Sequence, residues 1–141
     1  MSSENPVLDL VESPVHVPAR LRSTREDHIP RFIFQTFKTR FLPATMHEAV
    51  MSWINHNPDY EYQLFDDEAM FTYVEHVDYA PFSFTRDDLL KAMHSLKPGA
   101  GKADLLRYLI IYDRGGIYMD VDTVCMAPLH SFIHPEDDVV S

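Results

Sequence analysis

The sequence predicts an α/β domain in which a mostly parallel sheet is flanked by helices. β-prone stretches and stretches of helical periodicity follow one another in the order strand, helix, strand, three helices, strand. The segments between the expected strands are long enough for the crossovers that parallel pairing requires. Of the 141 residues, 45% are hydrophobic, which supplies enough apolar side chains for a single core.

The first half of this domain is expected to hold two strands. Residues 31–36 (RFIFQT) form an apolar β-prone run that suits a buried strand, and residues 60–65 form a second one. Between them, apolar residues from 46 to 54 fall on one helical face, and Pro58 is expected to stop that helix. An aspartate pair directly after the second strand can cap the helix that follows.

The second half is organised around residues 102–122. Before it, Thr85 and Asp88 have the spacing of a capping box that begins a helix. Apolar residues in 102–113 recur at i, i+4 spacing and give the next helix a core-facing side. Gly115-Gly116 is the expected place for a residue of positive φ that ends this helix. Residues 117–119 then form a short β-prone run.

Residues 1–28 are interpreted as a flexible leader, because they carry scattered prolines and no sustained period, and the domain is taken as residues 29–141. The formal net charge of −10 argues against nucleic acid as a partner. The single cysteine, Cys125, excludes an internal disulfide. No apolar run reaches the roughly 18 residues of a membrane span and no signal peptide is recognisable. We therefore expect a cytoplasmic protein without a transmembrane segment, or a Golgi-like location if the chain is a fragment.

Two aspartates stand at the far end of the last expected strand. Asp120 and Asp122 are two residues apart, so an extended backbone directs both carboxylates to one face. Ligands of parallel sheets bind beyond the carboxyl ends of the strands, where Gln35 and Phe37 also end the first strand. An Asp-x-Asp pair alone is weak evidence, since chance would give roughly one in a chain of this composition.

The preceding helix adds a second charged feature to this end of the sheet. Asp104 and Arg107 are three residues apart and lie on one helical face. Together with the two aspartates they suit an oxygen-ligated Mg²⁺ or Mn²⁺ and a phosphorylated substrate. An ordinary surface ion pair beside solvated acids is an equally valid interpretation of these residues on physical grounds alone.

These residues carry a resemblance. Segments 102–108 (KADLLRY) and 115–122 (GGIYMDVD) resemble the signature of DXD-containing sugar transferases of the glycosyltransferase family 32 group. Residues 29–38 resemble that family's opening strand, and residues 53–67 resemble its Trp…Asn-Pro-Asp-Tyr-Glu-Tyr…Asp-Asp segment. The resemblance implies the N-terminal nucleotide-binding part of a GT-A, Rossmann-like fold. Because the family continues well beyond its DXD motif, the resemblance also implies a domain that is incomplete at its C-terminus.

The resemblance assigns roles position by position. It implies that Asp122 binds the metal directly, that Asp120 supports the metal and contacts the donor, and that both are catalytic. The donor-binding side chains that it implies are Asp104, Arg107, Tyr118, Gln35 and Phe37. The family's opening strand usually reads His-Gln-x-Trp, and this chain has phenylalanine at both aromatic positions, which leaves the identity of the nucleotide base open.

The implied activity is metal-dependent transfer of a sugar, with retention of configuration, from a UDP- or GDP-sugar to a glycan, lipid or protein. The implied cofactor is Mn²⁺ or Mg²⁺. One alternative is a truncated or degenerate module that binds nucleotide-sugar and metal without catalysis. A third reading is a phosphatase of the haloacid dehalogenase type with Asp120 as nucleophile, although no lysine follows Asp122. An unfinished sheet edge would also favour self-association.

Overall fold

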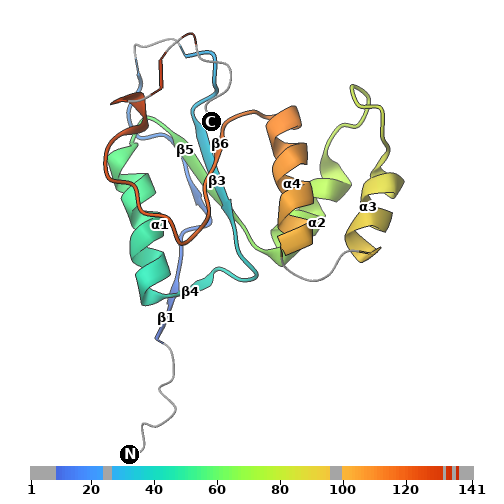
Figure 1. Ribbon diagram of the computed structural model, residues 1–141, viewed down its shortest axis with the longest axis horizontal. Helices are drawn as coiled ribbons and strands as arrows, with labels where there is room; N and C mark the ends of the chain where they lie inside the picture. Colours follow the sequence, from blue (N-terminus) through green and yellow to red (C-terminus); the bar gives the residue numbers. More distant parts are fainter. Residues whose placement is uncertain (1–8, 24–26, 96–99, 132, 135, 137–141) are drawn as a thin grey trace, which may run out of the picture.

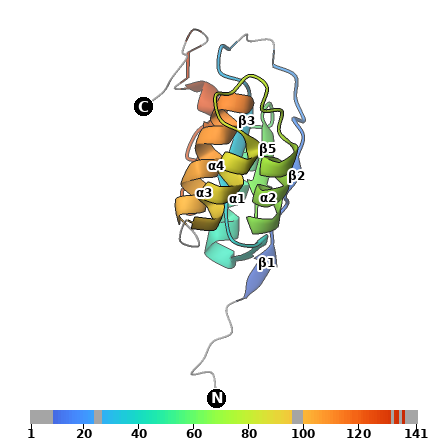
Figure 2. The ribbon, with the colours of Figure 1, turned by 90° about the vertical axis from the view of Figure 1, so that its right-hand side faces the viewer.

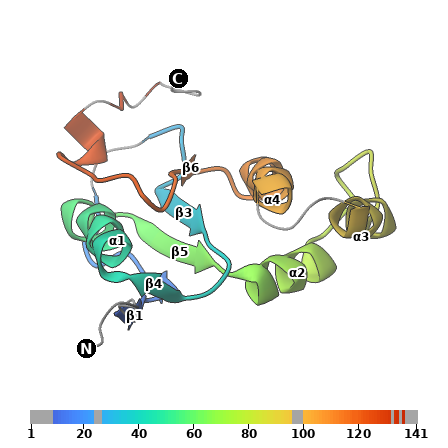
Figure 3. The same ribbon diagram turned by 60° about the horizontal axis from the view of Figure 1, so that its bottom comes forward.

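The computed structural model describes residues 9–23, 27–95, 100–131, 133, 134 and 136. Its elements in chain order are β1 (Leu10–Glu12), β2 (His16–Val17), β3 (Phe32–Thr36), β4 (Phe41–Pro43), α1 (Ala44–His56), β5 (Glu61–Phe65), α2 (Asp67–His76), α3 (Arg86–Ser95), α4 (Ala100–Asp113), β6 (Ile117–Tyr118) and the 3₁₀ turn η1 (Leu129–Ser131). Helix α1 covers one face of the sheet, and α2 and α4 lie on the opposite side with α3 outermost (Figures 1 and 3). The view in Figure 2 shows α2, α3 and α4 side by side in front of the strands.

The main sheet has the strand order β2-β5-β3-β6. Strand β3 pairs in parallel with both β5 and β6, so that Ile33 lies opposite Tyr62 on one side and Ile117 on the other. Strand β2 joins the outer side of β5 in the antiparallel sense. The predicted α/β class with a mostly parallel sheet is therefore confirmed, and the seven predicted helices and strands follow one another in the predicted order, with short unpredicted strands added.

Strand β3 is the centre of the domain because both of its faces are covered. All five of its residues are buried. Ile33 belongs to the core on the α1 side, whereas Phe32 and Phe34 belong to the core that α2, α3 and α4 cover. A strand buried on both faces needs a continuous apolar run, which is what its sequence provides.

Two helix starts that the sequence predicts are formed as expected. The Asp66 carboxylate accepts a hydrogen bond of 2.8 Å from the main-chain N–H of Ala69 and caps α2. Thr85 and Asp88 form the reciprocal capping box of α3, with bonds of 3.0 and 3.2 Å. These bonds to Thr85 hold the pKa of the Asp88 carboxyl below its usual value.

A two-glycine turn connects α4 to β6. Gly115 and Gly116 have φ angles of +74° and +103°, in the region that L-residues rarely adopt. The N–H of Gly115 donates to the carbonyls of Ile110 and Ile111 at 3.2 and 3.0 Å, which closes the last turn of the helix. A Cβ on Gly116 would lie 2.5 Å from the main-chain oxygen of Phe32. The turn thus brings β6 directly against β3.

The structure also contains three short strands that the sequence analysis does not predict. Strand β1 pairs with β4 in a separate two-stranded sheet, with Val11 opposite Leu42, and β2 extends the main sheet. Strands of two or three residues are too short to show a period, so only their tertiary partners define them. Residues 10–12 and 16–17 of the expected leader therefore pair with the domain, while the boundary at residue 28 stays a prediction. Within the part of the chain that is described, no helix combines the length and the apolar character needed to cross a bilayer.

The Gly116 turn yields a stability prediction. Replacing Gly116 with alanine introduces a Cβ that must displace the Phe32 backbone and also strains a positive φ, so we expect a loss of about 2–4 kcal/mol in the free energy of unfolding. Urea denaturation followed by circular dichroism measures this free energy of unfolding for both proteins. Gly101→Ala is the control, since an alanine within α4 is expected to be neutral or to stabilise by up to about 1 kcal/mol. A loss below about 0.5 kcal/mol for Gly116→Ala would contradict the close approach of β6 to β3.

Candidate functional site

The Asp-x-Asp pair lies in a turn directly after β6, at the carboxyl end of the parallel strands. The N–H of Met119 still bonds the carbonyl of Phe34 at 3.3 Å, so the chain leaves the sheet only at Asp120. Asp120 and Asp122 are exposed, whereas Val121 between them is 8% exposed and packs into the core on the α1 side. Burial of the middle residue therefore leaves both carboxylates at the surface.

The backbone of this turn is held from inside the domain. Asp120 offers its carbonyl to the side-chain amide of Gln35 at 3.1 Å, and to the N–H and hydroxyl of Thr123 at 3.0 and 2.6 Å. The carbonyl of Thr123 in turn accepts a bond of 2.9 Å from the indole N–H of Trp53. Strand β3 and helix α1 thus each contribute one side chain that anchors the turn.

Helix α1 also fixes the segment that follows the turn. The hydroxyl of Ser52 accepts a hydrogen bond of 2.8 Å from the N–H of Cys125. Asn57, which is 2% exposed, accepts a bond of 2.8 Å from the N–H of Leu129. No anchoring role is predicted from the sequence for Trp53 or Asn57. A buried tryptophan needs a hydrogen-bond acceptor for its N–H, and this general requirement is the feature of the sequence from which the role of Trp53 could have been predicted.

Four of the predicted site residues come together around Tyr118. The Arg107 guanidinium pairs with the Asp104 carboxylate at 2.9 Å and lies 5.1 Å from the centre of the Tyr118 ring. The Tyr118 hydroxyl is 3.2 Å from that of Thr36. Partial burial raises the pKa of Tyr118, and the Asp120 carboxylate acts in the same direction. Helix α4 and the Asp-x-Asp turn therefore present a single polar cluster.

Of the three remaining predicted residues, Asp122 is exposed in the turn, and Gln35 and Phe37 lie elsewhere in this region. Gln35 is completely buried beneath the turn and makes its hydrogen bonds to the protein itself. Phe37 is partly buried against the core on the α1 side, and its N–H continues the strand pairing by donating to the Phe65 carbonyl at 3.1 Å. The ring that contacts Tyr118 is that of Phe34, with 5.3 Å between the ring centres.

The residues of the turn fit a hard divalent cation in their chemistry. Carboxylate oxygens are the ligands that Mg²⁺ and Mn²⁺ prefer. Within the described ranges, no group of three or more histidine, cysteine, aspartate or glutamate side chains gathers in one place. Asp120 and Asp122 alone would therefore leave most of the coordination sphere to water and to the phosphates of a ligand, which is the usual arrangement for Mg²⁺.

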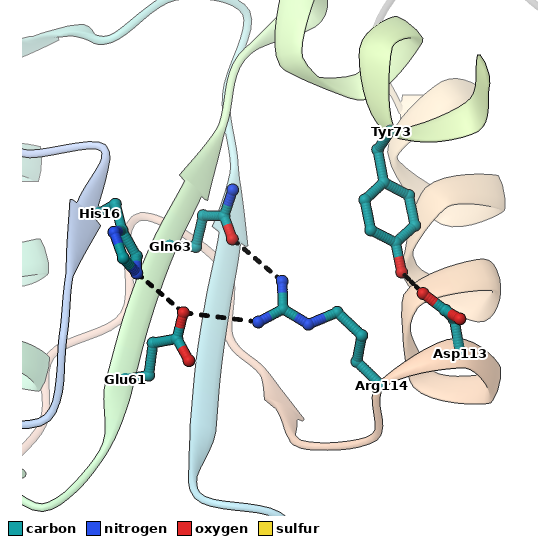
Figure 4. A network of polar contacts seen from close by, with 6 residues as sticks. All are labelled: His16, Glu61, Gln63, Tyr73, Asp113 and Arg114. Carbon is teal, nitrogen blue, oxygen red and sulfur yellow. Dashed lines mark hydrogen bonds and ion pairs between the residues drawn. The ribbon is translucent and has the colours of Figure 1, made fainter. Parts of the chain in front are cut away.

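A second polar network lies away from the turn, between β2, β5 and the end of α4 (Figure 4). Glu61 contacts His16 at 2.8 Å and Arg114 at 3.4 Å, and Arg114 also donates to Gln63 at 3.1 Å. Tyr73 donates to the Asp113 carboxylate nearby. Part of this network lines an open groove of about 730 Å³ whose walls include none of the predicted site residues. The network ties α4 to the sheet and is separate from the candidate site.

Comparison with known proteins covers most of the chain. Residues 43–140 match the model of a glycosyltransferase sugar-binding region that contains a DXD motif. The chain is 38% identical to inositol phosphoceramide mannosyltransferase 3 of Schizosaccharomyces pombe over 112 residues, which are 79% of this chain and 29% of that protein. It is 32% identical to the initiation-specific α-1,6-mannosyltransferase of Saccharomyces cerevisiae over 109 residues, 74% of this chain and 22% of that protein.

A third relative has the same pattern. The mannosyl phosphorylinositol ceramide synthase SUR1 of Saccharomyces cerevisiae is 32% identical over 107 residues, 74% of this chain and 26% of that protein. The chain thus spans less than a third of the length of these relatives. No solved structure matches it. The matched region runs from the start of α1 through the Asp-x-Asp turn, and it confirms the resemblance seen in the sequence. The chain belongs to the family of glycosyltransferases with a DXD-containing sugar-binding region.

Proposed function

We propose that this chain forms the donor-binding part of a metal-dependent sugar transferase. The observation that carries the proposal is the single polar cluster in which Asp120, Tyr118, Arg107 and Asp104 meet at the carboxyl end of the parallel strands. Parallel α/β sheets bind ligands at this edge. The proposed ligand is a nucleotide-sugar, whose diphosphate would lie at the turn and whose sugar would lie against α4.

The two aspartates have different surroundings, and we assign them different roles. The carboxylate of Asp122 is exposed and is assigned as the direct metal ligand, whereas Asp120 lies beside the Tyr118 hydroxyl and supports the metal and the donor. A bound Mn²⁺ or Mg²⁺ would stabilise the negative charge that develops on a departing diphosphate. As in the family that the sequence resembles, the transfer is proposed to retain the anomeric configuration.

The helix contributes the contacts to the sugar. Arg107 has its guanidinium stacked over Tyr118 and is 37% exposed, so it is oriented yet still open to a ligand. Asp104 is 60% exposed and pairs with Arg107 through one carboxylate oxygen, which leaves the other available to sugar hydroxyls. Because the three relatives named above are all described as mannosyl-transferring enzymes, we propose mannose as the sugar.

The free edge of the sheet supports a further part of the proposal. Strand β6 lies at one end of the strand order and pairs only with β3 among the described strands. Edge strands with unpaired N–H and C=O groups recruit other chains. We propose that the isolated chain self-associates through this edge, and a monodisperse monomer in sedimentation analysis would contradict it.

The metal site yields a binding prediction. Mn²⁺ with GDP-mannose, at about 100-fold their Kd, should stabilise the folded chain by about 2.7 kcal/mol and raise its melting temperature by roughly 10 °C. Asp122→Asn keeps the size of the side chain and removes its charge, so the increase should disappear. Differential scanning fluorimetry with a panel of GDP- and UDP-sugars measures it.

The matched control is Asp87→Asn, which changes an exposed aspartate in the first turn of α3. An increase that survives in Asp122→Asn would overturn the metal assignment. Binding without any hydrolysis of the donor in the presence of Mn²⁺ would favour the non-catalytic alternative.

The sugar contact yields a second prediction. Arg107→Lys keeps the charge but removes the planar fork and its stacking on Tyr118, so the Kd for GDP-mannose should rise about tenfold. Isothermal titration calorimetry measures it. Arg86→Lys is the control, since Arg86 also stacks on a tyrosine, 5.4 Å from the Tyr79 ring, but on α3. Equal affinities for Arg107→Lys and the unsubstituted chain would exclude Arg107 from the donor site.

A further inference from the structure

Two buried polar side chains lie beneath the Asp-x-Asp turn. Gln35 on β3 is 0% exposed and Tyr62 on β5 is 1% exposed. Ile33 and Tyr62 lie opposite each other in the register and both belong to the core on the α1 side. Gln35 stands two residues further along β3, so it shares this face and is the diagonal neighbour of Tyr62.

These side chains form a hydrogen-bonded relay to the turn. The Tyr62 hydroxyl donates to the amide oxygen of Gln35 at 2.8 Å, and the amide nitrogen of Gln35 donates to the carbonyl of Asp120 at 3.1 Å. Since the amide oxygen is occupied by Tyr62, the amide nitrogen must face the turn. Burial raises the pKa of Tyr62, so its hydroxyl stays protonated and remains a donor across the physiological range.

The bond from Gln35 ties the carbonyl of Asp120 to β3, one residue beyond the main-chain bond from Met119 to Phe34. The other two donors to the same carbonyl both come from Thr123, which belongs to the turn itself. They close the turn on itself but do not fix its position relative to β3. At the other end of the turn, Trp53 provides the corresponding attachment through Thr123.

The polar character of Gln35 is costly where it lies. An amide taken out of water is tolerated only with its hydrogen bonds made, and an apolar side chain of similar volume would fill this place without that cost. What the amide adds is a directional hydrogen bond, because it binds the carbonyl of Asp120 from the side of β3. The direct contact with the donor that the resemblance implies for Gln35 would require the side chain to be exposed, which it is not.

We propose that Gln35, oriented by Tyr62, is a positioning residue that fixes the backbone of Asp120 and thereby sets the affinity of the turn for a divalent cation and diphosphate. The ligand in this inference is taken from the proposed function, whereas the positioning of the turn by Gln35 does not depend on that function. Outer groups that orient metal ligands typically change metal affinity by about tenfold or more when they are removed.

The test measures the position of the turn and the binding of the ligand in two separate experiments. Tyr62→Phe removes one hydroxyl and keeps the ring, and Gln35→Met keeps the volume and removes both bonds. Without any metal, amide hydrogen exchange of Thr123, whose N–H bonds Asp120, should become at least about tenfold faster in both variants. Tyr73→Phe is the matched control. It also removes a tyrosine hydroxyl that donates a hydrogen bond, but the acceptor is the Asp113 carboxylate in the separate polar network.

The second measurement uses Mn²⁺ titrated into each protein in the presence of GDP-mannose. The Kd for Mn²⁺ should rise about tenfold in Tyr62→Phe and in Gln35→Met and stay unchanged in Tyr73→Phe. Because both changes act through one relay, Tyr62→Phe should have no further effect in a Gln35→Met background. A purely structural role would lower the melting temperature of the variants and leave the Kd for Mn²⁺ unchanged.

The outcomes are distinguishable. Unchanged exchange at Thr123 in both variants would overturn the positioning role whatever the ligand does. Faster exchange with an unchanged Kd for Mn²⁺ would overturn the link between position and affinity. If the unsubstituted chain binds neither Mn²⁺ nor GDP-mannose, the proposed function fails together with the affinity part of this inference, whereas faster exchange would still support the position of the turn.

Discussion

The close approach of Gly116 to the backbone of Phe32 is the constraint on which the rest of the structure depends. A Cβ at this position would lie 2.5 Å from a main-chain oxygen, so only glycine allows β6 to pair with β3. That pairing puts Tyr118 opposite Phe34, with the two rings 5.3 Å apart. Helix α4 before the glycines and the turn after β6 are thereby fixed relative to each other. The connection between α4 and β6 is short, and Arg107 on α4 lies over the ring of Tyr118 on β6.

Buried side chains hold the backbone of the candidate site in place. Its two carboxylates are solvated and cost little to place at the surface, so their position is decided by buried groups beneath them. Gln35 and Trp53 attach the turn at its two ends, and Asn57 attaches the chain further on. Each of these side chains is buried and makes a hydrogen bond to a main-chain group of the turn or of the segment after it. Interior hydrogen bonding, not surface charge, therefore defines the shape of the site.

The sequence was informative where a pattern has a local cause. The continuous apolar run of β3, the capping box at Thr85 and the two glycines each follow from burial or backbone geometry within a few residues. Strands β1, β2 and β4 could not be predicted, because two or three residues show no period and their pairing depends on distant segments. The roles of Gln35 and Trp53 were hidden for the same reason, since their partners at 120 and 123 lie far along the chain.

Electrostatics favours a divalent cation in the proposed site. The chain has a formal net charge of −10, and a nucleotide-sugar carries a negative diphosphate, so the field of the whole protein opposes binding. Arg107 is the cation beside Tyr118, but its charge is already paired with Asp104 at 2.9 Å. The polar cluster is therefore negative overall once Asp120 and Asp122 are counted. A divalent cation on the turn would cancel the charge of the two carboxylates and turn an anion-repelling edge into one that accepts phosphate. The paired arginine would then serve to orient the sugar rather than to attract the diphosphate.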